Sequence, residues 1–163
     1  MIMKSKGKTN AIRILEQMGI HFETREYQAD ESDLSARAVA LKVNLPLEQV
    51  FKTLVLKGDR TGHLVAVIPG NREADMKALA ALSGNKRVEL IDLKDLQPLT
   101  GYVRGGCSPV GMKRHFPTYI DESARSFPFI SVSAGVRGMQ VLMNPHDLLR
   151  ATSGSWGKIS REG

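Results

Sequence analysis

VFKTLVLKGDRTGHLVAVIP, residues 50–69, is the stretch that decides the fold of this chain. Two apolar runs, VFKTLVL and HLVAVIP, flank the polar connection KGDRTG, which contains two glycines. Apolar runs of this length joined by a glycine-containing connection are typical of an antiparallel strand pair. We therefore predict a β-hairpin here, whose second strand ends at Pro69 because proline has no N–H to give to a sheet.

Helices and strands are intermixed along the rest of the chain. Apolar residues at helical spacing predict helices, and short apolar or alternating runs predict strands. We predict helices at residues 9–19, 33–44, 73–84, 92–99 and from 144, and strands at 20–27, 87–91, 100–106, 117–121, 127–133 and 138–143. Several strand connections are too short for the crossovers of a doubly wound parallel sheet. The pattern predicts an α+β fold, a curved, mixed and largely antiparallel sheet or barrel flanked by helices.

Two of these helices carry leucines that the spacing places on the inner face. Ser35 is the predicted N-cap of the helix at 33–44, in which Leu41 is expected to pack inward beside Val39. In the helix at 73–84, Leu79 and Leu82 are the expected inner residues.

The length of 163 residues suits a single domain of ordinary size. We place this domain at residues 9–152, after a basic mobile arm at 1–8 and before a loose C-terminal tail at 153–163. No apolar run approaches the ~20 residues needed to cross a bilayer, and no apolar segment follows the basic start. We therefore expect a cytoplasmic protein that does not engage a membrane.

Charge and cysteine content narrow the possible functions. The 23 lysines and arginines exceed the 17 acidic residues, and the net charge of +6 suits a polyanionic partner without requiring one. Cys107 is the only cysteine, which excludes an internal disulfide and fits a reducing compartment. The four histidines are scattered singly, with neither CxxC nor HExxH spacing, so a metal site is not supported.

Lys52 is the unusual residue of the predicted hairpin, because it lies within an apolar strand. Alternation in a strand places Lys52 on the same face as Leu54 and Leu56. An unpaired ammonium buried there needs a carboxylate partner, a lowered pKa or an anionic ligand. The alternative is that the amine reaches solvent from the strand end, as lysines commonly do.

A glycine-rich segment, TGYVRGGCSPVGMKR at residues 100–114, is the second candidate site. Gly105 and Gly106 allow a sharp turn, in which successive N–H groups can form an anion-binding nest or an oxyanion hole. A plain surface turn is the alternative. Cys107 lies in this segment, but no histidine base is tied to it by sequence, so we do not favour a nucleophilic role.

The third candidate is ISVSAGVRGMQV, residues 130–141, where Ser131 and Ser133 share one face of a strand that ends near Gly135. A serine beside a glycine at a strand end suits either a hydrogen-bonding pocket or ordinary hairpin chemistry. No GxSxG elbow surrounds these serines, which argues against a serine-hydrolase triad.

Together these stretches resemble the YbaK/EbsC family of aminoacyl-tRNA deacylases, relatives of the editing domain of bacterial prolyl-tRNA synthetase. The matching segments are VFKTLVL, HLVAVIPGNREADMKALA, TGYVRGGCSPVGMK, PTYIDESA and ISVSAGVRG. The resemblance extends from about Ala11 to Leu149, and the combination of segments is more specific than any one of them. It implies a curved mixed sheet flanked by helices, which agrees with the pattern above.

The resemblance implies a trans-editing enzyme that removes a wrong amino acid from a charged tRNA, most typically cysteine from Cys-tRNA(Pro). It implies charged tRNA as a partner, prolyl-tRNA synthetase as a transient one, and neither a cofactor nor a metal. The residues that it marks as catalytic are Lys52, Gly106 and Ser133, and those that it marks as substrate-binding are Tyr27, Thr53, Gly105 and Gly135.

Two mechanisms are compatible with this resemblance. The thiol of a cysteinyl ester can attack its own carbonyl and form a small cyclic thiolactone, or a bound water can hydrolyse the ester. Ala134 and Val136 stand where relatives often have glycine and a basic residue. Because Val136 is uncharged, this chain lacks the cation that relatives often have near the pocket mouth. Cysteine rather than alanine specificity is the family's usual property and is not readable from these residues.

Two other functions are compatible with the sequence. The same fold can serve as a non-catalytic tRNA-binding or regulatory module, which would bind tRNA in a salt-dependent way and leave the ester intact. A hydrolase of small acyl esters is the other, although the cationic stretch at residues 113–115 argues mildly against it.

Overall fold

The computed structural model describes residues 8–163, so most of the predicted arm at 1–8 lies outside the described residues. The helices are α1 (Asn10–Gln17), α2 (Ala36–Val43), α3 (Met76–Ser83), α4 (Leu96–Thr100) and α5 (Pro145–Thr152), with 3-10 turns at Leu47–Gln49, Leu93–Asp95 and Glu122–Ser126. The strands are β1 (Phe22–Glu26), β2 (Phe51–Gly58), β3 (Gly62–Pro69), β4 (Arg72–Ala74), β5 (Val88–Leu90), β6 (Thr118–Asp121), β7 (Ile130–Ser133), β8 (Met139–Met143), β9 (Ser155–Gly157) and β10 (Ser160–Glu162).

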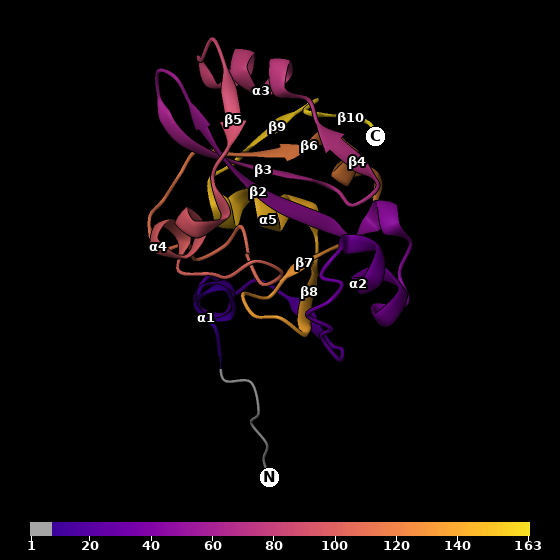
Figure 1. Ribbon diagram of the computed structural model, residues 1–163. Coiled ribbons are helices and arrows are strands. Elements are labelled where there is room, and N and C mark those ends of the chain that lie inside the picture. Colours follow the sequence, from indigo (N-terminus) through magenta and orange to yellow (C-terminus); the bar gives the residue numbers. More distant parts are fainter. Residues whose placement is uncertain (1–7) are drawn as a thin grey trace.

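The predicted hairpin is confirmed, and it forms the centre of the molecule. β2 and β3 pair antiparallel over their full length, from Phe51 opposite Pro69 to Gly58 opposite Gly62. They belong to a five-stranded sheet of order β5-β2-β3-β6-β9, in which β6 and β9 run parallel to their neighbours. Figure 1 shows α3 beyond one side of this sheet, with α1, β7 and β8 on the other.

The remaining strands form two smaller sheets. β1, β8 and β7 pair antiparallel in that order, and β10 pairs antiparallel with β4. The predicted α+β class is therefore confirmed as a set of separate sheets, and no closed barrel forms among residues 8–163.

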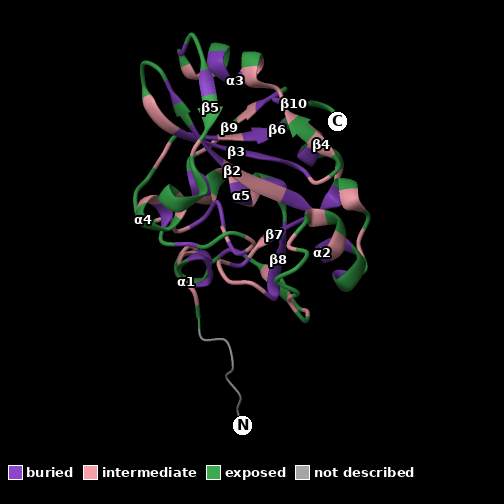
Figure 2. Cartoon of the chain, in the orientation of Figure 1, coloured by how far each residue is buried: buried purple, intermediate pink, exposed green. Residues whose placement is uncertain are grey.

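Alternation along the hairpin divides its side chains between two apolar layers. Phe51, Val55 and Val67 pack into the larger cluster, which also contains residues of β7, β8 and α1. Leu56 and Ile68 face the opposite way and pack with α3 in a second cluster. Figure 2 shows β3 as mostly buried, whereas the first half of β2 is mostly intermediate. Because Lys52 shares its face with Leu54 and Leu56, its amine lies at the border of the second cluster.

Side-chain caps begin α2 and α3, and the cap of α2 is the predicted Ser35. The Ser35 hydroxyl accepts a hydrogen bond from the Ala38 N–H at 3.2 Å, and the Asp75 carboxylate accepts one from the Ala78 N–H at 3.0 Å. Each cap satisfies an N–H that has no partner within its own helix. The cap at Ser35 fixes the start of α2, which borders the site described below.

Two leucines do not lie where their spacing places them. Leu41 is 79% exposed and Leu82 is 48% exposed, whereas Val39 and Leu79 are buried as predicted. Both helices have only eight residues, and each buries a single narrow face. Leu41 and Leu82 lie outside these faces, which only the packing of the short helices decides.

The predicted strand at residues 100–106 is wrong. Thr100 ends α4, and Gly101 adopts a left-handed conformation as the C-cap of that helix. The Tyr102 N–H then donates to the Thr100 hydroxyl at 3.0 Å, and the Tyr102 hydroxyl donates to the Val110 carbonyl at 2.7 Å. These contacts fold the segment onto itself, and its backbone pairs with no strand among residues 8–163.

The predicted loose tail at 153–163 is also wrong, because the segment contains two strands. β9 pairs with β6, and β10 pairs with β4. Between them Ile159 is fully buried against the cluster around α3, and its N–H donates to the Asp121 carboxylate at 3.1 Å. Strands of three residues are too short to show periodicity, and their partners lie far away in the sequence.

Within residues 8–163, no helix is long and apolar enough to span a membrane.

Candidate functional site

A cavity of about 820 Å³ opens at the beginning of β2. Its walls come from the start of α2, the first residues of β2, the segment that leads into β4, the loop at 104–107, and the facing positions of β7 and β8. Four of the seven residues that the sequence marks line this cavity: Lys52, Thr53, Gly105 and Ser133. Segments separated by up to 81 positions in the chain, from Lys52 to Ser133, thus meet in one place.

The beginning of β2 is open to the cavity because its outer neighbour is short. β5 pairs only with Leu56, Lys57 and Gly58. Near the start of the strand, a single parallel bridge joins Val50 to Ser131 of β7. Between these two contacts, the outer edge of β2 has no paired strand among residues 8–163, and Lys52 and Thr53 lie there.

Lys52 is half-buried, and its amine donates a hydrogen bond to the Gly70 carbonyl oxygen at 3.4 Å. Burial lowers the pKa of the Lys52 amine, and the negative charge of Glu73 opposes this shift. Within residues 8–163, no carboxylate lies within ion-pair distance of the amine, and Glu73 instead pairs with Arg161 at 2.9 Å. Lys52 therefore lines the cavity without an ion-pair partner among residues 8–163, and a cation in this state can attract an anionic ligand.

Thr53 carries a polar atom without a partner. Its hydroxyl oxygen is buried and makes no hydrogen bond among the described residues. A buried hydroxyl left unpaired costs ~1–3 kcal/mol, so such atoms are rare in folded proteins. Because Thr53 lines the cavity, its hydroxyl is a candidate contact for a ligand.

The two glycines of the loop differ in whether the backbone N–H already donates a hydrogen bond. Gly105 lines the cavity in a left-handed conformation with φ of +81°, and its N–H has no acceptor among residues 8–163. The Gly106 N–H donates to the Val103 carbonyl oxygen at 2.9 Å. A Cβ added to Gly106 would lie 2.9 Å from the backbone nitrogen of Arg137. In this conformation Gly106 closes the turn and gives no N–H to the cavity, so Gly105 is the better candidate donor.

Ser133 reaches the cavity, whereas Gly135 does not line it. The Ser133 hydroxyl oxygen accepts a hydrogen bond from the Gly135 N–H at 3.1 Å. This contact orients the hydroxyl and leaves its own hydrogen free to donate to a ligand. Gly135 has φ of +101° and lies against Tyr102, and the hydrogen bond to Ser133 links it to a residue of the cavity wall.

Tyr27 lies behind the cavity wall and not in the cavity itself. It packs against the apolar cluster of α2 and borders a small void of about 10 Å³, together with Leu34, Val39 and Gly105. These three residues also line the main cavity. Tyr27 therefore supports the wall in this conformation.

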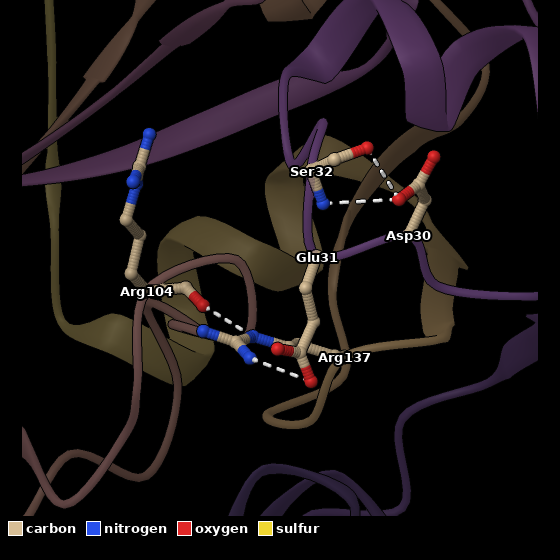
Figure 3. Close-up of polar contacts among 5 residues, drawn as sticks. All are labelled: Asp30, Glu31, Ser32, Arg104 and Arg137. Carbon is tan, nitrogen blue, oxygen red and sulfur yellow. Dashed lines mark hydrogen bonds and ion pairs between the residues drawn. The ribbon is translucent and has the colours of Figure 1, made fainter.

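Arg137 ties the glycine loop to two other segments. Its Nε donates to the Arg104 carbonyl oxygen at 2.8 Å, and its guanidinium lies 3.9 Å from the Glu31 carboxylate. Figure 3 shows these contacts, with the Arg104 side chain extending away from them. The loop that carries Gly105 is thus held by a residue of the β7–β8 connection.

Sequence reasoning missed several lining residues. Three arginines, Arg37, Arg72 and Arg104, line the cavity besides Lys52, against the single acidic side chain of Glu73. Their excess of positive charge suits a phosphate-bearing ligand. The missed signal is the arginine in each of two segments already singled out, GNREAD and YVRGG.

Gln140 and Cys107 complete the floor of the cavity. Gln140 is buried, stands opposite Ser133 in the β7–β8 pair, and accepts a hydrogen bond from the Ser131 hydroxyl at 2.7 Å. Burial raises the pKa of the Cys107 thiol to about 12. A thiol with so high a pKa is a poor nucleophile at neutral pH, which supports the view that Cys107 does not attack the substrate.

The chain is similar in sequence to proteins that are named as aminoacyl-tRNA deacylases. EbsC of Enterococcus faecalis, named for a proposed Cys-tRNA(Pro)/Cys-tRNA(Cys) deacylase activity, is 49% identical over 157 residues, which is 96% of each chain. ProXp-y of Escherichia coli K12, named a multifunctional Ser/Thr-tRNA deacylase, is 27% identical over 143 residues, which is 85% of this chain and 84% of that one.

A solved structure agrees with these relatives. A crystal structure described as that of a proposed trans-editing enzyme for prolyl-tRNA synthetase has a TM-score of 0.83 and 25% identity. The match covers 93% of this chain and 95% of the other. A family model described as an aminoacyl-tRNA editing domain matches residues 31–151, a range that holds every residue lining the cavity except Gly163. The chain therefore belongs to the aminoacyl-tRNA editing domain family.

Proposed function

We propose that this aminoacyl-tRNA deacylase removes cysteine from Cys-tRNA(Pro). The observation that carries the proposal is that Lys52 lines one cavity together with Gly105 and Ser133. The identity of 49% with EbsC over nearly the whole of both chains supports the choice of substrate. The excess of cations around the cavity supports a ligand that carries phosphate.

In the proposed complex, the aminoacyl ester of the terminal adenosine occupies the cavity. The ammonium of Lys52 attracts the terminal phosphate and the polarised ester. The Gly105 N–H donates to the oxygen that becomes negative when the carbonyl is attacked. The hydroxyls of Thr53 and Ser133 hold the amino acid and the ribose in position, so the protein contributes positioning and charge stabilisation.

We propose that the substrate's own thiol is the attacking group. The thiol gives up its proton, and its sulfur attacks the carbonyl carbon of the same cysteine. The ester C–O bond then breaks, the 3′-oxygen of the tRNA leaves and takes up a proton, and a thiolactone is released. This route needs no nucleophile from the protein, which fits the raised pKa of Cys107. Attack by water would instead release free cysteine, so the product distinguishes the two routes.

The experiment is a deacylation assay with cysteinyl-, alanyl- and seryl-tRNA, in which the product of each is identified. Seryl-tRNA belongs in the set because the ProXp-y relative is named for serine and threonine. We expect the fastest turnover with the cysteinyl ester and a thiolactone product. Turnover of the seryl or alanyl ester at an equal rate would contradict the proposed specificity, and tRNA binding without turnover would instead show a non-catalytic module.

The variant that tests the site is Lys52→Met, with Lys158→Met as its matched control. Lys158 is exposed and lies outside the cavity. We expect Lys52→Met to lose at least about 100-fold in kcat, the order seen when one charge-stabilising donor is removed. We expect Lys158→Met to keep its activity. Full activity in Lys52→Met would remove the assignment.

The cellular setting follows from the same proposal. A deacylase of charged tRNA would act in the cytoplasm, where mischarged tRNA is made. A transient complex with prolyl-tRNA synthetase would bring it to that substrate, and co-purification with the synthetase in the presence of tRNA would test this.

A further inference from the structure

A second cavity of about 540 Å³ lies at the far end of β2 from the site. The end of β2, the first turns of α3 and the segment that leads into β5 form its walls. Figure 1 shows α3 and β5 at one end of β2, whereas α2 and β4 lie at the other. Neither the family resemblance nor the proposed chemistry uses this cavity.

The charge of this second cavity is mostly positive. Its basic residues are Lys57, Lys77, Lys86 and Arg87, and its acidic residues are Asp59 and Glu89. Within residues 8–163, none of the four cations forms an ion pair.

The two carboxylates do not neutralise the whole group. Glu89 stands directly opposite Lys57 in the β2–β5 pair, so these two opposite charges are neighbours. The Asp59 carboxylate accepts hydrogen bonds from the backbone N–H groups of Lys86 and Arg87, at 3.0 and 3.1 Å. Lys77, Lys86 and Arg87 are therefore exposed cations that form no ion pair with a carboxylate of residues 8–163.

A buried hydrogen-bond network holds this basic wall in place. Asn85, which is 8% exposed, accepts hydrogen bonds from the N–H groups of Arg60 and Thr61 and donates to the hydroxyls of Thr61 and Ser83. Gly58 permits this arrangement, because a Cβ there would lie 2.2 Å from the Asn85 amide. The segment that carries Lys86 is thus fixed to the β2–β3 turn, so its cations project from a rigid support.

The second cavity lies on the same side of the five-stranded sheet as the Lys52 amine. Its walls include Met76, Ala80 and Val88, which belong to the apolar cluster around α3 or pack against it. Leu54, which packs against that same cluster, lines the first cavity. Gly58 lies six positions after Lys52 along β2, a length of about 20 Å at the rise of a strand. An RNA strand with stacked bases covers this distance in about six nucleotides.

We propose that this second cavity binds the sugar–phosphate backbone of the substrate's acceptor stem while the aminoacylated 3′ end occupies the first. The inference rests on the proposed function, because it takes tRNA to be the substrate. Its chemistry is that of sequence-independent phosphate recognition, in which lysine and arginine replace the counter-ions of the RNA. The second cavity then favours a whole tRNA over a short fragment with the same 3′ end.

The test compares two substrates that share one ester. The first is cysteinyl-tRNA(Pro), and the second is a cysteinylated CCA trinucleotide, which spans only about 10 Å when stacked and cannot reach the second cavity. The variants are Lys77→Glu and Lys86→Glu, with Arg13→Glu as the control for equal charge change. Arg13 is exposed on α1, outside both cavities.

We expect Lys77→Glu and Lys86→Glu to lower kcat/KM for the tRNA roughly tenfold and to leave kcat/KM for the trinucleotide unchanged. Arg13→Glu should change neither value. In Lys86→Ala, the affinity for tRNA should depend less steeply on salt: the magnitude of the slope of log affinity against log salt concentration should decrease by about one. Equal losses on both substrates, or no loss on tRNA, would overturn the proposal.

A binding measurement separates this proposal from the proposed function. The affinity of uncharged tRNA for each variant is measured without any chemistry. If the wild-type chain binds tRNA but cleaves no ester, the proposed function fails, and weaker tRNA binding in Lys86→Glu still supports the second cavity. If the ester is cleaved and Lys86→Glu binds tRNA as tightly as the wild type, the second cavity is not an RNA site.

Discussion

The Lys52 amine donates a hydrogen bond to the Gly70 carbonyl oxygen at 3.4 Å, across the open end of the β2–β3 hairpin. This contact points the amine along the cavity wall and satisfies one of its three hydrogens. No carboxylate of residues 8–163 lies within ion-pair distance of this amine. The protein thus holds a positive charge in place and leaves it available to a ligand.

The stability of the protein should depend on the titration of Lys52. Because burial lowers the pKa of this amine below its ordinary value of 10.5, the unfolded chain binds a proton more readily than the folded chain. Raising the pH from the folded pKa toward 10.5 should therefore increase the free energy of unfolding. The measurement is urea denaturation of the wild type and Lys52→Met across this range, and the difference between the two should grow in favour of the wild type. A difference that shrinks with pH would mean that the amine is stabilised as a cation.

The unpaired hydroxyl of Thr53 should matter for activity and not for stability. In Thr53→Val a methyl group replaces a buried hydroxyl that has no hydrogen-bond partner in the described part of the chain, so the midpoint of thermal unfolding should stay constant or rise. Its kcat/KM should fall roughly fivefold to tenfold, the value of one hydrogen bond to the substrate. The matched control is Thr152→Val, which removes a hydroxyl that donates to the Leu148 carbonyl at 2.9 Å. Thr152→Val should lose ~1 kcal/mol of stability and keep its activity. A loss of stability in Thr53→Val would contradict the prediction, because it would mean that the Thr53 hydroxyl has a hydrogen-bond partner.

Gly105 and Gly19 offer a comparison of two glycines in the left-handed region. Alanine at either position should cost about 1–2 kcal/mol of stability, because φ is +81° at Gly105 and +69° at Gly19. At Gly19 a Cβ meets nothing within 4 Å, whereas at Gly105 it approaches the Leu34 side chain to 3.1 Å beside the cavity. Thermal unfolding should therefore report similar losses, and the deacylation assay should report a loss for Gly105→Ala alone. Equal activity in the two variants would show that the Gly105 amide has no role.

Arg137 should control the loop that carries Gly105. In Arg137→Met the hydrogen bond to the Arg104 carbonyl disappears, so hydrogen exchange at residues 104–107 should accelerate and KM should rise. Glu31→Gln is the control, because the Glu31 side chain is 86% exposed and lies 3.9 Å from the guanidinium. An exposed pair of this kind contributes ~0–1 kcal/mol, so the control should behave as the wild type. Unchanged exchange in Arg137→Met would show that the loop is held by other contacts.

The central hairpin and the candidate site were predictable from sequence to different degrees. Apolar alternation around a glycine-containing connection predicted β2 and β3, since that pattern is local to 20 residues. It also placed Leu54 and Leu56 together on one face of β2, and both pack in the cluster around α3. Short strands such as β9 and β10 left no such pattern, because three residues carry too little periodicity to distinguish a strand from a tail.

The sequence did not predict which backbone and side-chain atoms of the site are free to bind a ligand. Gly105 and Gly106 are adjacent and chemically identical, yet the N–H of Gly106 closes a turn on Val103 while that of Gly105 has no acceptor among residues 8–163. The arginines of the cavity gave no periodic signal, since charged residues mark surfaces of every kind. Only the folded chain brings Arg37, Arg72 and Arg104 around one space.

By itself the sequence determined the family, the strand pair at the centre and the presence of a lysine on an apolar face, because these depend on residue order over short distances. The tertiary structure decided that this lysine lines one cavity with a glycine loop and a serine from distant segments, and that β5 is short enough to leave the start of β2 without a paired strand among residues 8–163. The physical reason is that alternation fixes which way a side chain points, whereas the neighbours that it meets depend on packing between segments far apart in the chain.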